Sequence, residues 1–419
     1  MRRPVNRTLN YGERILAENI KVPNDTKLTG LNNNDLIIGS SGAGKTGGYV
    51  IPNLQNITGS LVVSDTKGLL NHMFKNELIQ KGYDVYTIDL VNPKRSCGYN
   101  PLDAIRCYED GSFREQDILT LAHTLIPALD SKEPFWEQAA RGYIAFLISY
   151  CLETLDKEDH NMLSICELHR AFLQPGGKTA FLSKMEQKEN SFALKKYQHL
   201  VGTQDADKMW SSIMEFATRG LENFEFREAH YIFNNPNSFN IRTLGRKKTV
   251  LFLNLSDTDR TFDSFINIFY TQALQILCDQ ANQRPSGRLA VPVRIIMDDF
   301  ATNANIPNFD KIISVIRSRD ISVSLILQSL TQLEAMYCKP VATTIINNCD
   351  HLLYLGTQDI DTANFIGCRA FKTPEDILCM PRDKAYIITN GEKAKLVNKI
   401  KPYSTMENSP KRYLEASPF

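Results

Sequence analysis

Residues 35–46 read DLIIGSSGAGKT, and this stretch decides the fold of the chain. A short apolar run leads into eight residues that satisfy GxxxxGK[ST] at every fixed position, the pattern of a phosphate-binding loop between a strand and a helix. The glycines let successive backbone N–H groups turn toward phosphate oxygens, beside the positive end of the following helix. The predicted nucleotide-binding residues are Gly39, Ser40, Ser41, Gly42, Ala43, Gly44, Lys45 and Thr46.

The rest of a nucleotide site is predicted around this loop. In such loops the lysine, here Lys45, bridges the β- and γ-phosphates, and the hydroxyl of Thr46 ligates Mg²⁺. The segment RIIMDD at 294–299 supplies the acid that the site needs at the end of a neighbouring strand. Asp298 is predicted to hold Mg²⁺ through water and Asp299 to polarise the attacking water, although a strand ending in a solvated turn also fits this segment alone. We therefore expect ATP and Mg²⁺ as cofactors and ATP hydrolysis as the reaction.

Outward from the loop, short apolar runs separated by turn residues occur in two parts of the chain. They occupy 36–38, 60–64 and 85–88 in the first part, and 249–255, 293–297, 322–327, 351–355 and 385–389 in the second. Near-continuous apolar runs of this length are typical of parallel strands covered on both faces. With helical patterns between them, the two parts predict one α/β domain with a mostly parallel sheet.

The middle of the chain has a different pattern. Apolar residues recur at helical spacing from residue 116 to residue 153, and the stretches 164–173, 193–200 and 209–216 continue this pattern. We predict an all-α domain at 105–243, inserted into an α/β domain formed by 1–104 and 244–419. The insertion holds 15 Lys and Arg against 20 Asp and Glu, a net charge of −5. This charge suits protein docking better than general DNA binding.

Composition places the whole chain among ordinary globular proteins. Of 419 residues, 42% are hydrophobic, and 48 Lys and Arg nearly balance 47 Asp and Glu, so a strongly basic nucleic-acid binder is not indicated. The nine cysteines never stand in CxxC spacing, which argues against a zinc site or a secreted disulfide framework. No apolar run approaches the roughly 20 residues needed to span a bilayer, so we expect a soluble chain.

Several separated motifs resemble those of type IV secretion coupling proteins, the TraG/TraD-like conjugation ATPases. They are the phosphate loop, DTKG at 65–68, YNPLD at 99–103, PFW at 134–136 and the block from 295 to 367. That block opens with IIMDDFATNANIPNFDKIISVIRSRDISVSLILQSLTQLEAMY, the closest match to the family pattern, and ends with NNCDHLLYLGTQDIDTANFIG. The motifs occur in the family's order, and the resemblance covers about residues 11–400.

The resemblance implies a hexameric, membrane-anchored motor in which a RecA-like P-loop NTPase domain carries an inserted all-α domain. Such a motor works on the cytoplasmic side of the bacterial cell membrane. It delivers relaxase-bound single-stranded DNA, or effector proteins, to a type IV secretion channel. The implied partners are therefore a relaxase or effector, channel components, single-stranded DNA and further copies of the chain.

Two more residues acquire roles through the resemblance. Gln328 follows the apolar run at 324–327, where RecA-like motors place a polar sensor of the γ-phosphate; a surface-capping glutamine is the simpler alternative. Arg317, after an amphipathic segment, lies where ring-forming relatives present an arginine finger to the neighbouring subunit's nucleotide. A cation interacting with a helix dipole also explains Arg317, and Arg319 is a weaker candidate for the finger. The predicted catalytic residues are thus Lys45, Asp299, Gln328 and Arg317.

Three features depart from the family pattern. No transmembrane segment precedes residue 20, so we expect either a shortened chain or a member without its own anchor. Asn-Ala-Asn at 303–305 replaces the usual Asn-Leu-Gly, and Asp299 stands where the family usually has Glu. Aspartate draws the carboxylate back by roughly 1 Å, and such a displacement costs on the order of 100-fold in rate when water positioning limits turnover. Without membrane segments to help form rings, the isolated chain is expected to be mostly monomeric and slow in hydrolysis.

Two other functions stay open at this point. An FtsK-like translocase for double-stranded DNA shares the motor chemistry, although we find no C-terminal winged-helix module in the sequence. A nucleotide-binding substrate receptor or adaptor with little hydrolysis is supported by the Asp-Asp pair and the missing anchor. ATP turnover with and without single-stranded DNA, measured on oligomeric protein, would separate these functions.

Overall fold

The structure is a computed structural model, and it describes residues 11–127, 135–188, 190–201, 207–256, 258–300 and 305–401. Of the motif residues named above, 134 and 301–304 lie outside these ranges. The chain divides into unit 1, made of Met1–Val85, Arg242–Phe252 and Leu277–Phe419, and unit 2, made of Tyr86–Ile241 and Leu253–Ile276. This division falls within individual strands and helices, and the domain boundaries proposed from the sequence, at 104/105 and 243/244, stay a prediction.

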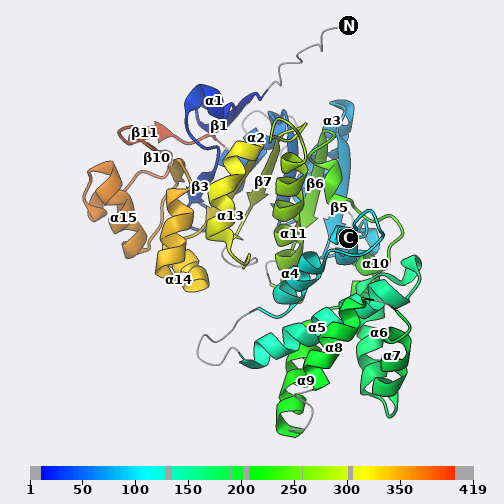
Figure 1. Cartoon of the computed structure of the whole chain (residues 1–419). Helices are drawn as coiled ribbons and strands as arrows, with labels where there is room; N and C mark the ends of the chain where they lie inside the picture. The colour runs from blue at the N-terminus through cyan, green and yellow to red at the C-terminus, as the bar shows by residue number, and fades with distance from the viewer. Residues whose placement is uncertain are drawn as a thin grey trace, which may run out of the picture. The chain divides into compact units, whose positions relative to one another are not determined.

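A nine-stranded sheet forms the centre of the α/β part, in the order β11-β10-β9-β3-β8-β7-β4-β6-β5 (Figure 1). Neighbouring strands from β9 through β3, β8 and β7 to β4 pair in parallel, whereas β10 is antiparallel to β9 and to β11. The mostly parallel α/β sheet that the sequence predicts is therefore confirmed. The strands are β3 (Asp35–Ile38), β4 (Ser60–Asp65), β5 (Asp84–Asp89), β6 (Thr249–Asn254), β7 (Val293–Met297), β8 (Ile321–Leu327), β9 (His351–Tyr354), β10 (Lys384–Thr389) and β11 (Lys395–Asn398).

The burial of each strand explains whether it could be predicted from the sequence. Every residue of β3, β4, β6, β8 and β9 is buried, so these strands consist of near-continuous apolar runs. Three further strands were not predicted: β11, and the separate antiparallel hairpin of β1 (Glu13–Ala17) and β2 (Ile20–Pro23). β2 and β11 contain no fully buried residue, and for that reason no apolar run marks them.

Helices follow most strands of unit 1. The loop after β3 leads into a π-helical turn, η1 (Thr46–Val50), whose residues Tyr49 and Val50 pack in one buried cluster with Ile296 and Ile326 of the sheet. This packing anchors the loop at its helical end. The other elements are α1 (Thr26–Thr29), α2 (Ile51–Gln55), α3 (Leu69–Gln80), α13 (Phe309–Val315), the 3₁₀ turn η6 (Ile316–Arg319), α14 (Leu330–Asn347), α15 (Ile360–Ala370) and α16 (Pro374–Leu378).

Unit 2 is built from helices around α5 (Phe135–Thr154), which packs against α4, α6, α7, α8 and α9. Tyr143 and Phe146 of α5 are fully buried and contact the ring of Phe172. The surrounding helices are α4 (Glu115–Leu125), α6 (Met162–Leu173), α7 (Gly177–Met185), α8 (Phe192–Val201), α9 (Asp207–Glu222) and α10 (Arg227–Phe233). One further helix, α11 (Asp263–Asn282), runs from unit 2 into unit 1. Among all the helices in the described ranges, none is long and apolar enough to cross a membrane.

Candidate functional site

The glycine-rich loop at 39–46 lies where β3 ends, and hydrogen bonds tie it to the strands on both sides. The backbone N–H of Gly39 donates to the carbonyl of Leu327 at the end of β8 over 3.0 Å, and that of Ser40 donates to the carbonyl of Gly356 beyond β9 over 2.9 Å. Gly42 and Gly44 have φ angles of 76° and 94°, values that residues other than glycine rarely adopt. The loop therefore needs glycine for its backbone conformation, since no atom lies near either added Cβ position.

Lys45 folds back over this loop. Its Nζ donates hydrogen bonds to the carbonyl oxygens of Gly39 (2.9 Å) and Ser40 (3.4 Å). The ammonium group is thereby held above the curled backbone, where loops of this type bind phosphate. A phosphate oxygen entering the loop would compete with these neutral carbonyls for a charge-assisted hydrogen bond, which is the stronger kind.

The structure brings Thr46 together with Asp298, although the two residues are 252 positions apart. The Thr46 hydroxyl donates to Oδ2 of Asp298 over 3.2 Å. Asp298 directly follows β7 and is only 7% exposed, and its backbone N–H donates to the Ser64 hydroxyl over 2.6 Å. A hydroxyl and one carboxylate beside a phosphate loop match the way proteins bind Mg²⁺, with phosphates and water completing the octahedron.

Burial raises the pKa of Asp298 to about 6, and the neighbouring charge of Asp299 adds to this effect. Lys45 and the hydrogen bond from Thr46 act in the opposite direction. A carboxylate that is costly to ionise is stabilised when a divalent cation binds beside it. The residues present therefore fit a Mg²⁺ ion held at this position.

Asp299 lies in the turn after Asp298 and has a left-handed backbone, with φ of 50°. Its N–H donates to Oδ1 of Asp298 over 3.1 Å. Asp and Asn adopt this conformation several times more readily than other residues with side chains. The turn therefore offers a physical reason for Asp at a position where the family pattern has Glu.

Gln328 follows β8 directly and lies next to the loop, because Leu327 pairs in register with Ile38 on β3. Its backbone N–H bonds the side chain of Gln332 over 3.3 Å, and its carbonyl accepts from the Thr357 hydroxyl over 3.4 Å. Its side chain is half-buried. The structure thus places Gln328 at the same sheet edge as Lys45.

Arg317 is not brought to this edge. It lies in η6, before β8 begins, and its Nη2 donates to the carbonyl of Gly30. Since β8 is parallel to β3, Arg317 lies where these strands start and the loop lies where they end. The seven residues of β8 span roughly 20 Å at about 3.3 Å per residue. Arg317 is therefore too far from its own chain's loop to contact the same phosphate.

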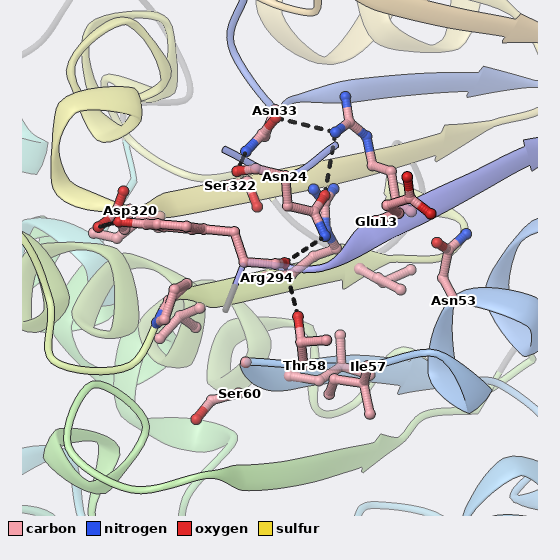
Figure 2. A pocket seen from close by; sticks show the side chains of 18 of the residues that line it. Glu13, Asn24, Asn33, Asn53, Ile57, Thr58, Ser60, Arg294, Asp320 and Ser322 are labelled. Atoms are coloured by element: carbon pink, nitrogen blue, oxygen red, sulfur yellow. Dashed lines mark hydrogen bonds between the residues drawn. The ribbon is translucent and has the colours of Figure 1, made fainter. Parts of the chain in front are cut away.

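A small hollow at this starting edge is shown in Figure 2, with Arg294, Asp320, Ser322 and Ser60 around it. Its volume is about 60 Å³, and Arg317 also lines it. A water needs roughly 10–15 Å³ measured in this way, so the hollow has room for a few waters and not for a nucleotide. The phosphate loop itself lies at the opposite edge of the sheet, where β3 ends.

Beneath that hollow lies a buried ionic group that sequence reasoning missed. Asp35, the first residue of β3, is paired with Arg14 at 3.0 Å and Arg294 at 3.1 Å. It also accepts a hydrogen bond from the Tyr49 hydroxyl at 2.6 Å, and this hydroxyl contacts Ser324 at 2.7 Å. Because Tyr49 belongs to the π-helical turn after Thr46, the group fixes that turn against β3 and β8. In the sequence, the only signal for this buried ionic group is Asp35 itself, a charged residue at the start of an otherwise apolar strand.

Together, the loop after β3, the acid after β7 and the glutamine after β8 are the elements of a P-loop nucleotide-binding protein. Solved structures support the fold. The unbound coupling protein TrwBdeltaN70 aligns with a TM-score of 0.68 at 16% identity, over 92% of this chain and 88% of that one. VirB4 of Thermoanaerobacter pseudethanolicus aligns with a TM-score of 0.55 at 11% identity, over 90% and 91% of the two chains. The RecA-like α/β fold expected from the sequence is thereby confirmed.

The chain belongs to the family described as type IV secretory system conjugative DNA transfer, whose model matches residues 8–370. Among curated proteins, VirD4 of Rhizobium rhizogenes and VirD4 of Agrobacterium fabrum are each 23% identical to it over 335 residues, which is 79% of this chain. The chain spans about half the length of these relatives, 48% in each case. The family expected from the motifs is confirmed.

Proposed function

We propose that the chain is an ATP-driven coupling protein, which brings relaxase-bound single-stranded DNA, protein substrates or both to a type IV secretion channel. The observation that carries the proposal is the contact of Thr46 with the buried Asp298 beside a complete phosphate loop. Family membership supports conjugative DNA transfer as the process in which the chain acts. The coupling protein TrwB has been solved with ADP and Mg²⁺ and with ATP and GTP analogues, which supports ATP and Mg²⁺ as cofactors here.

In this proposal each residue near the loop has a distinct task. Backbone N–H groups of 39–46 and the Lys45 ammonium bind the β- and γ-phosphates. Thr46 and Asp298 would hold a Mg²⁺ ion, which when bound would supply positive charge beside the phosphates. Asp299 orients and polarises the attacking water, and Gln328 contacts the γ-phosphate from the end of β8.

Arg317 completes the site of a neighbouring copy. It is exposed, and it lies at the sheet edge opposite to its own phosphate loop. An arginine so placed can reach a γ-phosphate only across an interface between subunits, where it would neutralise transition-state charge. A ring of identical subunits, a homo-hexamer as in the family, satisfies this requirement, and the isolated chain is then a slow monomer.

Family membership supports the proposed partners and place of action. The RecA-like domain, proposed as 1–104 with 244–419, drives movement, and the acidic all-α domain at 105–243 docks a relaxase, an effector or channel components. The complex works at the cytoplasmic side of the bacterial cell membrane.

Calorimetric titration of the chain with ATP and Mg²⁺, followed by ATPase assays with and without single-stranded DNA, tests the proposal. Lys45→Ala should abolish binding and turnover, whereas Lys27→Ala, an exposed lysine of α1, should change neither. Turnover by the assembled chain should rise with single-stranded DNA. Tight binding without any turnover in demonstrable rings would instead identify a nucleotide-binding substrate receptor.

A further inference from the structure

The small hollow at the starting edge of the sheet (Figure 2) has unused hydrogen-bond donors in its wall. Arg294 of β7 and Ser322 of β8 both line it, and they pair in register on adjacent parallel strands, so their side chains share one face of the sheet. Arg294 donates from Nη1 to the Ser324 hydroxyl over 2.9 Å and to Asp35 over 3.1 Å. Within the described ranges, its Nε and Nη2 have no hydrogen-bond partner, nor has the hydroxyl of Ser322, a residue that is only 8% exposed.

The charge beneath the hollow is unbalanced. Arg14 and Arg294 both pair with a single carboxylate, that of Asp35. Burial lowers the pKa of the neighbouring His351, so its imidazole is neutral at pH 7. The buried group therefore carries one positive charge in excess. A buried charge is costly unless an opposite charge and hydrogen bonds compensate it.

Two carboxylates also line the hollow, and neither supplies the missing negative charge. Asp320 is already paired with Arg288 and accepts a hydrogen bond from the Tyr11 hydroxyl over 3.2 Å. Glu13 is exposed, so water screens its charge. Arg317 lines the hollow as well and adds positive charge. The surroundings therefore favour a negatively charged occupant.

The size of the hollow and its donors suit a small anion. A volume of about 60 Å³ accommodates a few waters, and so also one monatomic or tetrahedral inorganic ion. Guanidinium N–H groups bind anions through charge-assisted hydrogen bonds, which are about twice as strong as neutral ones. The hydroxyl of Ser322 can donate to the same ion. Water can fill this space, but it brings no charge to balance the arginines.

We propose that this hollow is an anion-binding site, in which Arg294 and Ser322 hold a small inorganic anion such as chloride or phosphate. The site is separate from the phosphate loop, and it does not depend on nucleotide binding. Its occupant balances the buried group around Asp35, to which Tyr49 of the π-helical turn is bonded. The bound anion thus stabilises the support of the phosphate loop from the opposite edge of the sheet.

The test uses the full chain carrying Lys45→Ala, which disables the phosphate loop as a competing anion site. Inorganic phosphate is titrated by calorimetry and sodium chloride by chloride NMR line broadening, both in gluconate buffer without other inorganic anions. Arg294→Met removes the guanidinium, and Arg284→Met, at an exposed arginine that does not line the hollow, is the matched control. Ser322→Val removes the hydroxyl and keeps the pair of Arg294 with Asp35, so it decides the test if Arg294→Met does not fold.

The Lys45→Ala chain should bind phosphate, chloride or both saturably, and the two titrations identify the preferred ion. Arg294→Met should weaken this binding at least about tenfold and Ser322→Val at least about threefold, because each removes donors to the ion, whereas Arg284→Met should leave it within about twofold. No saturable binding of either anion by the folded Lys45→Ala chain, or an unchanged affinity in folded Ser322→Val, would overturn the anion site. Phosphate binding that requires Lys45 would also overturn it, while leaving the proposed function intact.

Discussion

Replacing Asp298 by asparagine is expected to stabilise the nucleotide-free chain while weakening its binding of Mg²⁺ and ATP. The carboxyl is buried beside Asp299, and burial, followed by that neighbouring charge, raises its pKa to about 6 from an ordinary value of 3.8. At about 1.4 kcal/mol per pKa unit, ionising this group at neutral pH costs the folded chain about 2–3 kcal/mol more than it costs the unfolded chain.

Asparagine removes this cost and can keep both hydrogen bonds. Its Oδ1 accepts from the Asp299 N–H as before, and its Nδ2 donates to the Thr46 hydroxyl, which now acts as acceptor. The gain must depend on pH in a defined direction. Well below pH 4 Asp298 is protonated in both states and no penalty exists; the penalty grows from just below pH 4 to about pH 6 and is complete above.

Thermal unfolding from pH 4.5 to pH 8 measures the effect, with Asp361→Asn, an exposed aspartate of α15, as control. At pH 7.5 the Asp298→Asn midpoint should rise by roughly 5–10 °C, given about 2–4 °C per kcal/mol for units of this size. The rise should shrink to about a third of that size at pH 4.5, and the affinity for ATP with Mg²⁺ should fall at least about tenfold. A lower or unchanged midpoint at pH 7.5, or a gain independent of pH, would refute the reasoning.

Further outcomes are expected at the other residues of unit 1. Tyr49→Phe leaves the buried Asp35 without one hydrogen bond, so the midpoint of unfolding should fall by an amount equivalent to about 1–3 kcal/mol; no change would mean that the ionic group does not hold the π-helical turn. Asp299→Glu should lower the free energy of unfolding by up to about 1 kcal/mol and should not raise turnover, because the left-handed backbone suits Asp; higher turnover would show that the short carboxylate limits the rate. Arg317→Ala should leave ATP affinity of the monomer unchanged and abolish the activity gained on assembly. Mixing it with Lys45→Ala should restore part of that activity, and no recovery in demonstrably mixed rings would exclude a site shared between subunits.

The fold class and the phosphate loop were predictable because local sequence encodes them. A loop whose backbone must curl needs glycines at particular spacings, and strands covered on both faces must be apolar along their whole length. Both requirements involve residues that are close together in the sequence. They also explain the missed strands: β2 and β11 contain no fully buried residue, so nothing in their sequence demanded an apolar run.

Other features depend on residues far apart in the chain. The contact of Thr46 with Asp298 spans 252 positions, and that of Lys399 with Ala43 spans 356. The strand order places the two acids on one side of β3 and the antiparallel hairpin on the other. It also puts Arg317 at the opposite edge of the sheet from the loop. The raised pKa of Asp298 follows from burial that only the packed sheet creates. The sequence by itself determined the chemistry of the phosphate loop and the type of fold. Only the tertiary structure decided which distant side chains meet there, because strand order and burial are properties of the whole folded chain.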